Sequence, residues 1–234
     1  MSPTALLVLV IVLAISFCLS AFVSSDSITN RFTASSLDIA LIEENYDKLT
    51  EKQRSELIPN RTLPKDPKVK NTDETDAFVF LKITVPVGSV TDVLEDGTRT
   101  VKEAQEQFRI KTEQNKDSNN RDTDFNTSPS GNNEYWIELP DFEEGTDHSG
   151  KTRTYVFGYS VYLKPDEVSE TLFDYVQLKN IVQYEVNANS TIKINVQAYG
   201  IQADYLDGIE KDSAGEKAVM TASQLTQIFG YVNG

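Results

Sequence analysis

The chain has 234 residues, of which 39% are hydrophobic and 25% charged, and its formal net charge is −14 at pH 7. Such an acidic balance excludes nucleic acid and anionic lipid as favoured partners, because both carry negative charge themselves. Its single cysteine, Cys18, lies in the apolar N-terminal segment, so we expect neither a disulfide framework nor a cysteine-based metal site, and no cofactor.

The N-terminal segment predicts export. Residues 5–23 form an uncharged apolar run, whose length suits either the core of a signal peptide or a marginal membrane span. Cys18 and Ser20 are small residues at positions −3 and −1 of a cleavage site before Ala21. We therefore predict a signal peptide over residues 1–20 and a secreted product with no membrane segment after cleavage; a retained anchor is the alternative.

Directly behind this site, residues 21–33 have the pattern of an extended strand. Phe22, Ile28, Phe32 and Ala34 fall on one parity, whereas the other parity is almost wholly polar, and the stretch lacks Gly and Pro. After a bend near two serines, a second alternation predicts a further strand. A terminal strand pairs either with its own domain or with the open sheet edge of a neighbour, and the sequence leaves both possibilities open.

The next two elements are a helix and a buried strand. Residues 45–58 are polar and helix-permissive, and Thr50 with Gln53 has the spacing of a capping box, which predicts a short surface helix. Residues 76–86 are apolar on both parities, as in a central strand that is buried on both faces. Residues 90–101 predict a hairpin around an Asp-Gly turn.

Residues 102–133 are the most polar part of the chain, and we predict a long polar insertion there, helical in its first third. Asp122, Asp124 and Asn126 have the spacing that opens a calcium loop. The glycine at the sixth position and the glutamate at the twelfth are missing, however. We interpret these residues as a solvated loop that holds no metal.

The C-terminal half predicts more strands and a helix. Strand patterns cover residues 134–139, 154–163, 171–186 and 192–198. Thr221 and Gln224 repeat the capping box, Leu225, Ile228 and Phe229 share one helical face, and Gly230 suits the residue just past a helix end. About eight to ten strands with one or two short helices indicate an all-β fold, a β-sandwich, in a single domain over residues 21–234.

Catalytic residues are not expected. His148 is the single histidine and lies between two glycines, which is typical of a hairpin tip rather than of a catalytic cleft. On a strand, the two residues of an acidic pair such as Glu43-Glu44 or Glu143-Glu144 would point to opposite faces and could not act together as an acid/base pair. We therefore interpret both pairs as solvated charge. The stripe at positions 155, 157 and 159 (Tyr, Phe, Tyr) predicts core packing rather than a sugar-binding surface.

One set of residues resembles a known family. The set consists of Asn30, Phe32, Ala34, Leu37, Asp38 and Ile39, followed by Glu43, Leu63, the triplet Lys65-Asp66-Pro67, and residues 69–71. In this order it resembles the TasA/camelysin family of exported proteins of Gram-positive bacteria. Residues 172–176 and 194–206 look like the closing strands of that family, whereas the polar insertion matches nothing in it.

The resemblance implies a jelly-roll sandwich that a signal peptidase of the SipW type releases to the cell surface or biofilm matrix. It also implies self-association into filaments by donor-strand exchange, with Phe22, Ile28, Asn30, Phe32 and Ala34 on the donor strand. Camelysin is described as a surface metallopeptidase, so a metallopeptidase is one alternative, which the lone histidine disfavours; a monomeric adhesion or binding module is another. We expect a structural subunit, not an enzyme.

Cleavage before Ala21 is the first testable prediction. The intact mass of protein recovered from culture supernatant should correspond to a chain that begins at Ala21 and contains no cysteine. A cell-bound product that still carries residues 6–19 would contradict it.

Overall fold

The computed structural model describes residues 37–55, 58–93, 98–117, 123–128, 134–139, 152–179 and 193–233. Several predictions concern residues outside these ranges. They are the signal peptide and its cleavage site (Cys18, Ser20, Ala21), the strand over residues 21–33 with Ala34, the pair Glu143-Glu144, and His148. Within the described part, no helix is long and apolar enough to cross a membrane.

The largest sheet is built around one long strand, β4 (Ala77–Val93). The sheet also contains β10 (Asn195–Gln202), β8 (Thr152–Tyr159), β7 (Trp136–Glu138) and β5 (Arg99–Glu106). The order is β10-β4-β8-β7, and β5 pairs with the far half of β4; all pairs are antiparallel. The β4–β5 pairing confirms the predicted hairpin, while its turn, residues 94–97, lies outside the described ranges.

Strand β4 is buried on both faces, as its apolar parities predict. Val79, Leu81 and Ile83 belong to one hydrophobic cluster, and Phe78 and Phe80 belong to the other. All five side chains have no solvent-exposed area. The two clusters therefore lie on opposite faces of the same strand.

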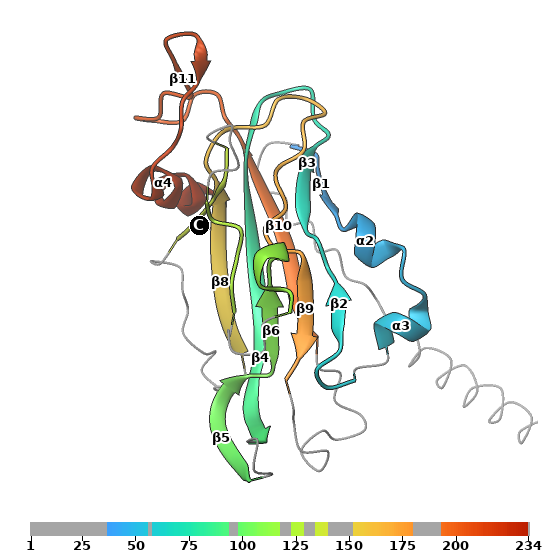
Figure 1. The fold of residues 1–234 in the computed structure, drawn as a ribbon. Helices are drawn as coiled ribbons and strands as arrows, with labels where there is room; N and C mark the ends of the chain where they lie inside the picture. Colours follow the sequence, from blue (N-terminus) through green and yellow to red (C-terminus); the bar gives the residue numbers. More distant parts are fainter. Residues whose placement is uncertain are drawn as a thin grey trace, which may run out of the picture.

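The first cluster lies between the large sheet and a second layer (Figure 1). This layer contains a sheet of β2 (Thr62–Pro64), β9 (Tyr175–Leu178) and β6 (Phe108–Lys111), and a pair of β1 (Ile39–Ile42) with β3 (Lys68–Asn71). Ile110, Val176 and Leu178 meet Leu81 and Phe157 of the large sheet in this cluster. The fold is all-β, as predicted.

The second cluster lies under helix α4 (Ala222–Asn233), which packs on the outer face of the large sheet (Figure 1). Leu225, Ile228 and Phe229 are buried there, and the rings of Phe80 and Phe229 lie 5.0 Å apart. The predicted capping box is confirmed, because Thr221 and Gln224 exchange hydrogen bonds at 3.0 and 3.3 Å. The predicted helix end at Gly230 is wrong, since the helix continues to Asn233.

Shorter elements complete the fold. They are α2 (Glu44–Asp47), α3 (Glu51–Ser55), a 3-10 turn over Glu113–Asn115, and the hairpin of β11 (Asp212–Ser213) with β12 (Glu216–Lys217). The capping box of α3 is confirmed: the Thr50 N–H donates to Gln53 at 2.9 Å, and the Gln53 N–H donates to Thr50 at 3.3 Å.

The described part of residues 102–133 corrects the sequence prediction. Its first third forms strands β5 and β6 instead of a helix. Residues 123–128 are not a solvated loop, because the Asp124 and Asn126 N–H groups donate to Ile110 and Leu172 carbonyls at 3.0 and 2.8 Å. The Phe125 ring lies 4.5 Å from the Phe157 ring. This segment therefore closes the edge of β6 and covers the first cluster.

Helix α4 supplies a stability test with an internal control. Phe229→Ala should lower the free energy of unfolding by about 3–5 kcal/mol, because it removes a buried ring from the second cluster. Tyr231→Ala, at a position 47% exposed on the same helix, should change it by about 0.5 kcal/mol or less. Urea denaturation measures both, and equal effects would contradict the assigned packing.

Candidate assembly site

Among the described strands, β10 is an edge strand of the large sheet. It is eight residues long and pairs with β4 from Asn195, opposite Thr84, to Gln202, opposite Ala77. A strand in this position directs half of its backbone N–H and C=O groups away from its neighbour, and these groups can pair with a further strand. The edge of β10 is therefore a template long enough for an added strand.

An apolar rim accompanies this edge. Six partly buried apolar side chains pack against the first cluster, and five of them come from β1, β2 and β10 or the residue before it. These five, which we call the lateral seam, are Ile39, Leu41, Leu63, Ile194 and Val196. The sixth, Phe125, belongs to the segment that closes β6. The first cluster is thus incompletely covered on the side where β10 and β2 end their sheets.

The chain approaches the same edge from its N-terminal side. Leu37, the first described residue, is 7% exposed. A Cβ placed on Gly200 of β10 would lie 2.8 Å from Leu37 Cδ2 and 3.1 Å from Ile39 Cγ2, so these two side chains pack directly against the backbone of β10 at a glycine. Leu37 thus places the start of the described chain against β10, directly after the predicted strand over residues 21–33 in the sequence.

A partly buried polar cluster holds the segment that follows β1. Asp66, 4% exposed, accepts hydrogen bonds from the Asn45 N–H and Nδ2 at 2.9 Å each, and from the Tyr46 N–H at 3.3 Å. Lys65 Nζ pairs with Glu43 at 2.8 Å and lies 4.2 Å from the centre of the Tyr46 ring. We call Glu43, Asn45, Lys65 and Asp66 the clasp.

The clasp has a clear local cause. The first N–H groups of any helix lack partners within the helix, and a carboxylate nearby also matches the helix dipole. Glu43, at the N-cap of α2, makes no side-chain cap hydrogen bond. Asp66, which comes from another part of the chain, accepts these N–H groups instead.

The sequence prediction for the first acidic pair is half wrong. The Glu44 side chain is 62% exposed and lies 3.6 Å from Lys68, as expected of solvated charge. The Glu43 side chain is only 13% exposed and is paired with Lys65. The family-like residues Glu43, Lys65 and Asp66 thus meet in space, which their separation in the sequence did not reveal.

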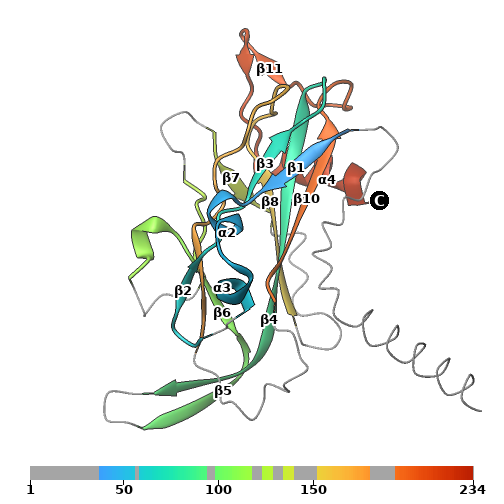
Figure 2. The ribbon, with the colours of Figure 1, turned by 90° about the vertical axis from the view of Figure 1, so that its right-hand side faces the viewer.

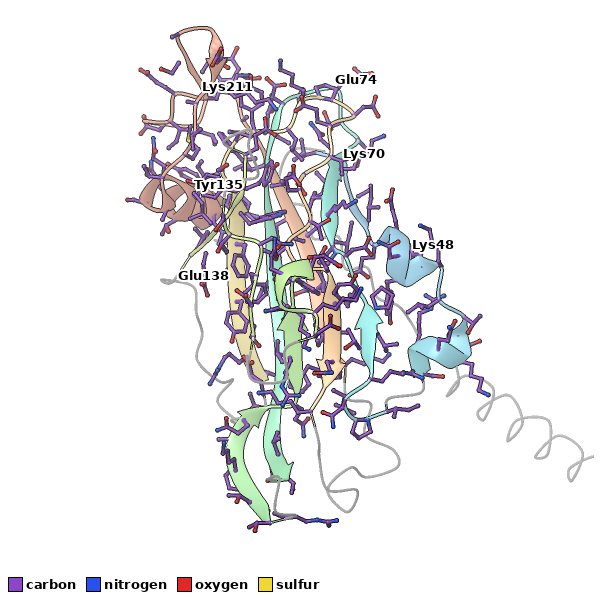
Figure 3. The ribbon with its side chains drawn as sticks, in the orientation of Figure 1. Lys48, Lys70, Glu74, Tyr135, Glu138 and Lys211 are labelled. Carbon is purple, nitrogen blue, oxygen red and sulfur yellow. The ribbon has the colours of Figure 1, made fainter. Side chains whose placement is uncertain are left out.

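A second polar cluster lies at the end of the molecule where Figure 3 labels Lys211 and Glu74. Lys211 Nζ lies 2.5 Å from Asp76 and 2.7 Å from Asp204. Burial acts to lower the pKa of Lys211, but its hydrogen bonds to Asp204 and Asp76 raise it overall. Burial, followed by the hydrogen bond to Asp212, raises the pKa of Tyr162 to about 12. These charges are mutually satisfied, and they fasten the β11–β12 hairpin.

Among the described residues, no group of three His, Cys, Asp or Glu side chains could hold a metal ion. Tyr155, Phe157 and Tyr159 are at most 8% exposed, which confirms core packing. The Tyr155 hydroxyl donates to Glu106, itself 4% exposed, and burial is the main reason that the pKa of Tyr155 is raised.

Comparison with known protein families, curated proteins and solved structures gives no match. The predicted donor residues, Phe22, Ile28, Asn30, Phe32 and Ala34, lie outside the described ranges. Sequence reasoning missed the seam as a unit, although the strand pattern over residues 192–198 contains two of its five members, Ile194 and Val196.

The clasp predicts unequal effects of two neighbouring substitutions. Glu43→Gln should lower the free energy of unfolding by about 3 kcal/mol, because it leaves the Lys65 ammonium buried without its counter-charge. Glu44→Gln, one residue away but exposed, should change it by less than about 1 kcal/mol. Chemical denaturation of the two variants provides the measurement, and a larger effect for Glu44→Gln would refute the burial of the clasp.

Proposed function

We propose that the protein is a structural subunit of extracellular filaments or biofilm matrix, and that its N-terminal strand pairs with the β10 edge of the next subunit. The observation that carries the proposal is the lateral seam, in which five partly buried apolar side chains accompany a sheet edge. Leu37, which follows the predicted donor strand in the sequence, packs against β10 at the same edge. Secretion, release by a SipW-type peptidase and a TasA-like identity belong to the same proposal.

The chemistry of the two surfaces is complementary. Phe22, Ile28 and Phe32 present one apolar face, and full burial of each such side chain contributes about 1.5–3 kcal/mol. The edge of β10 supplies ladder hydrogen bonds, as in other cases of strand addition. Apolar side chains of the added strand would complete the cover of the first cluster beside Leu63 and Ile194.

The same geometry favours a fibre over a closed oligomer. The donor surface and the acceptor surface are different parts of the chain, so each subunit can give one strand and receive another. Such head-to-tail contacts grow into open filaments unless the rotation between subunits closes a ring. Cleavage before Ala21 would free the donor strand, which couples assembly to export.

A jelly-roll sandwich is the fold that we infer for this subunit. In support of it, the chain passes repeatedly between the two layers: β2, β6 and β9 lie in one sheet, whereas β4, β8 and β10 lie in the other. A double-layered fold of this kind keeps a few sheet edges, and an edge can accept a strand.

Two changes to the N-terminal strand test exchange. A chain that begins at Ala21 should assemble, whereas deletion of residues 21–30 should give a folded monomer. Ile28→Asp with Phe32→Asp should do the same, because both charges would be buried in the seam without partners. Ser27→Asp with Thr33→Asp, on the polar parity, is the matched control and should still assemble.

Light scattering reports assembly and circular dichroism reports folding. Filaments that persist after the deletion refute exchange between subunits. A deletion that unfolds the domain shows that the strand pairs within its own molecule.

A further inference from the structure

Helices α2 and α3 occupy an unusual place in the fold. Figure 2 shows both helices across the side of the molecule between the β2 edge and the β10–β4 edge, and α2 contacts β2. This is the side of the lateral seam. We call residues 44–55 the strap.

The strap is fastened by polar contacts, and its apolar side chains, Tyr46 and Leu49, are only partly buried. Neither α2 nor α3 has a buried residue, and helices of four and five residues have little stability of their own. Outside the clasp, the Arg61 guanidinium also anchors the strap, because it donates a hydrogen bond to the Gln53 carbonyl at 2.8 Å. Lys48, between the two helices, lies on the outer side in Figure 3.

Polar anchors make a segment easy to release. When the strap lifts, its N–H and C=O groups exchange protein partners for water, and little apolar surface of the helices is newly exposed. Local opening is favoured where buried apolar contacts are few. The strands beneath the strap differ in this respect, because β4 is buried on both faces.

We propose that the strap is a removable cover of the lateral seam, which must lift before the N-terminal strand of a second copy can occupy it, and that Asp66 controls this opening. The inference rests on the proposed function and adds a regulatory step to it. In the closed state the clasp slows the first contact between subunits. In the assembled state the N-terminal strand of a second copy occupies the seam, and the strap is lifted.

Asp66 suits this role because its side chain and its backbone have separate partners. The carboxylate holds Asn45 and Tyr46 at the start of the strap. The backbone beside it is fastened elsewhere: the Lys65 N–H donates to the Asp174 backbone carbonyl at 3.0 Å, and the Pro67 carbonyl accepts from the Leu172 N–H at 3.1 Å. Asp66→Ala should therefore release the strap while β2 and β3 stay in place.

A thiol probe measures the opening directly. The chain from Ala21 onward has no cysteine, so Leu63→Cys places a single thiol in the seam on β2. In this background Asp66→Ala should raise the rate of maleimide labelling about tenfold, because it removes hydrogen bonds to a charged acceptor. Asp174→Ala is the control: it removes a carboxylate that accepts from Glu113 and Asn126, and it keeps the backbone carbonyl that accepts from Lys65, so it should leave the rate unchanged.

Assembly is then followed by light scattering without the probe. Asp66→Ala should shorten the lag several-fold relative to the unsubstituted chain, and Asp174→Ala should not. If circular dichroism shows that Asp66→Ala is unfolded, Asn45→Ala replaces it. This variant removes one side-chain hydrogen bond and should give smaller changes in the same directions.

The outcomes separate the two proposals. Unchanged labelling in a folded Asp66→Ala variant overturns the cover, and so does faster labelling with an unchanged lag. If neither the unsubstituted chain nor any variant forms filaments, the proposed function itself fails, and the cover of a donor seam fails with it.

Discussion

Burial of β4 on both faces is the constraint on which the rest of the structure depends. One parity of the strand packs against the layer of β2, β6 and β9, and the other packs under α4. A strand buried in this way needs partners on both of its edges and a cover on both of its faces. β10 and β8 supply the edges along its first half, and α4 supplies one cover. The second layer supplies the other cover, and it leaves the apolar rim that we call the lateral seam.

The seam and the clasp solve different physical problems. The seam is apolar and partly exposed, so a strand that covers it gains hydrophobic stabilisation. The clasp is polar and mostly buried, so it contributes geometry more than net stability: ion pairs of this kind offset their own desolvation and little beyond it. Its value lies in fixing α2 at a defined place, close to where β1 meets β10. The proposed function requires such a division between a strong core and a weakly held cover.

The sequence predicted those features that depend on neighbouring residues. Both capping boxes need only a spacing of three, and both are present. Continuous apolar character over residues 76–86 was enough to place the central strand. Alternation at residues 155, 157 and 159 was enough to place three side chains in the core.

Features that depend on distant partners were missed. The residues of β5 are exposed from Arg99 to Ala104, so their polar composition suggested a helix or a loop, and only pairing with β4 makes them a strand. Glu43 looked solvated because Lys65, its partner, comes 22 residues later. Gly230 looked like a helix end, but burial of Val232 carries the helix further.

The central claim is that the N-terminal strand of one subunit pairs with β10 of another. Solid-state NMR of filaments grown from an equal mixture of 15N-labelled and 13C-labelled subunits tests it most directly, because 15N–13C contacts in such a sample join different molecules. The account predicts contacts between the backbone of residues 21–33 and that of residues 195–202 in the mixed sample. The claim is contradicted if these contacts are absent from the mixed sample and appear only when both labels are on the same subunit, diluted among unlabelled subunits.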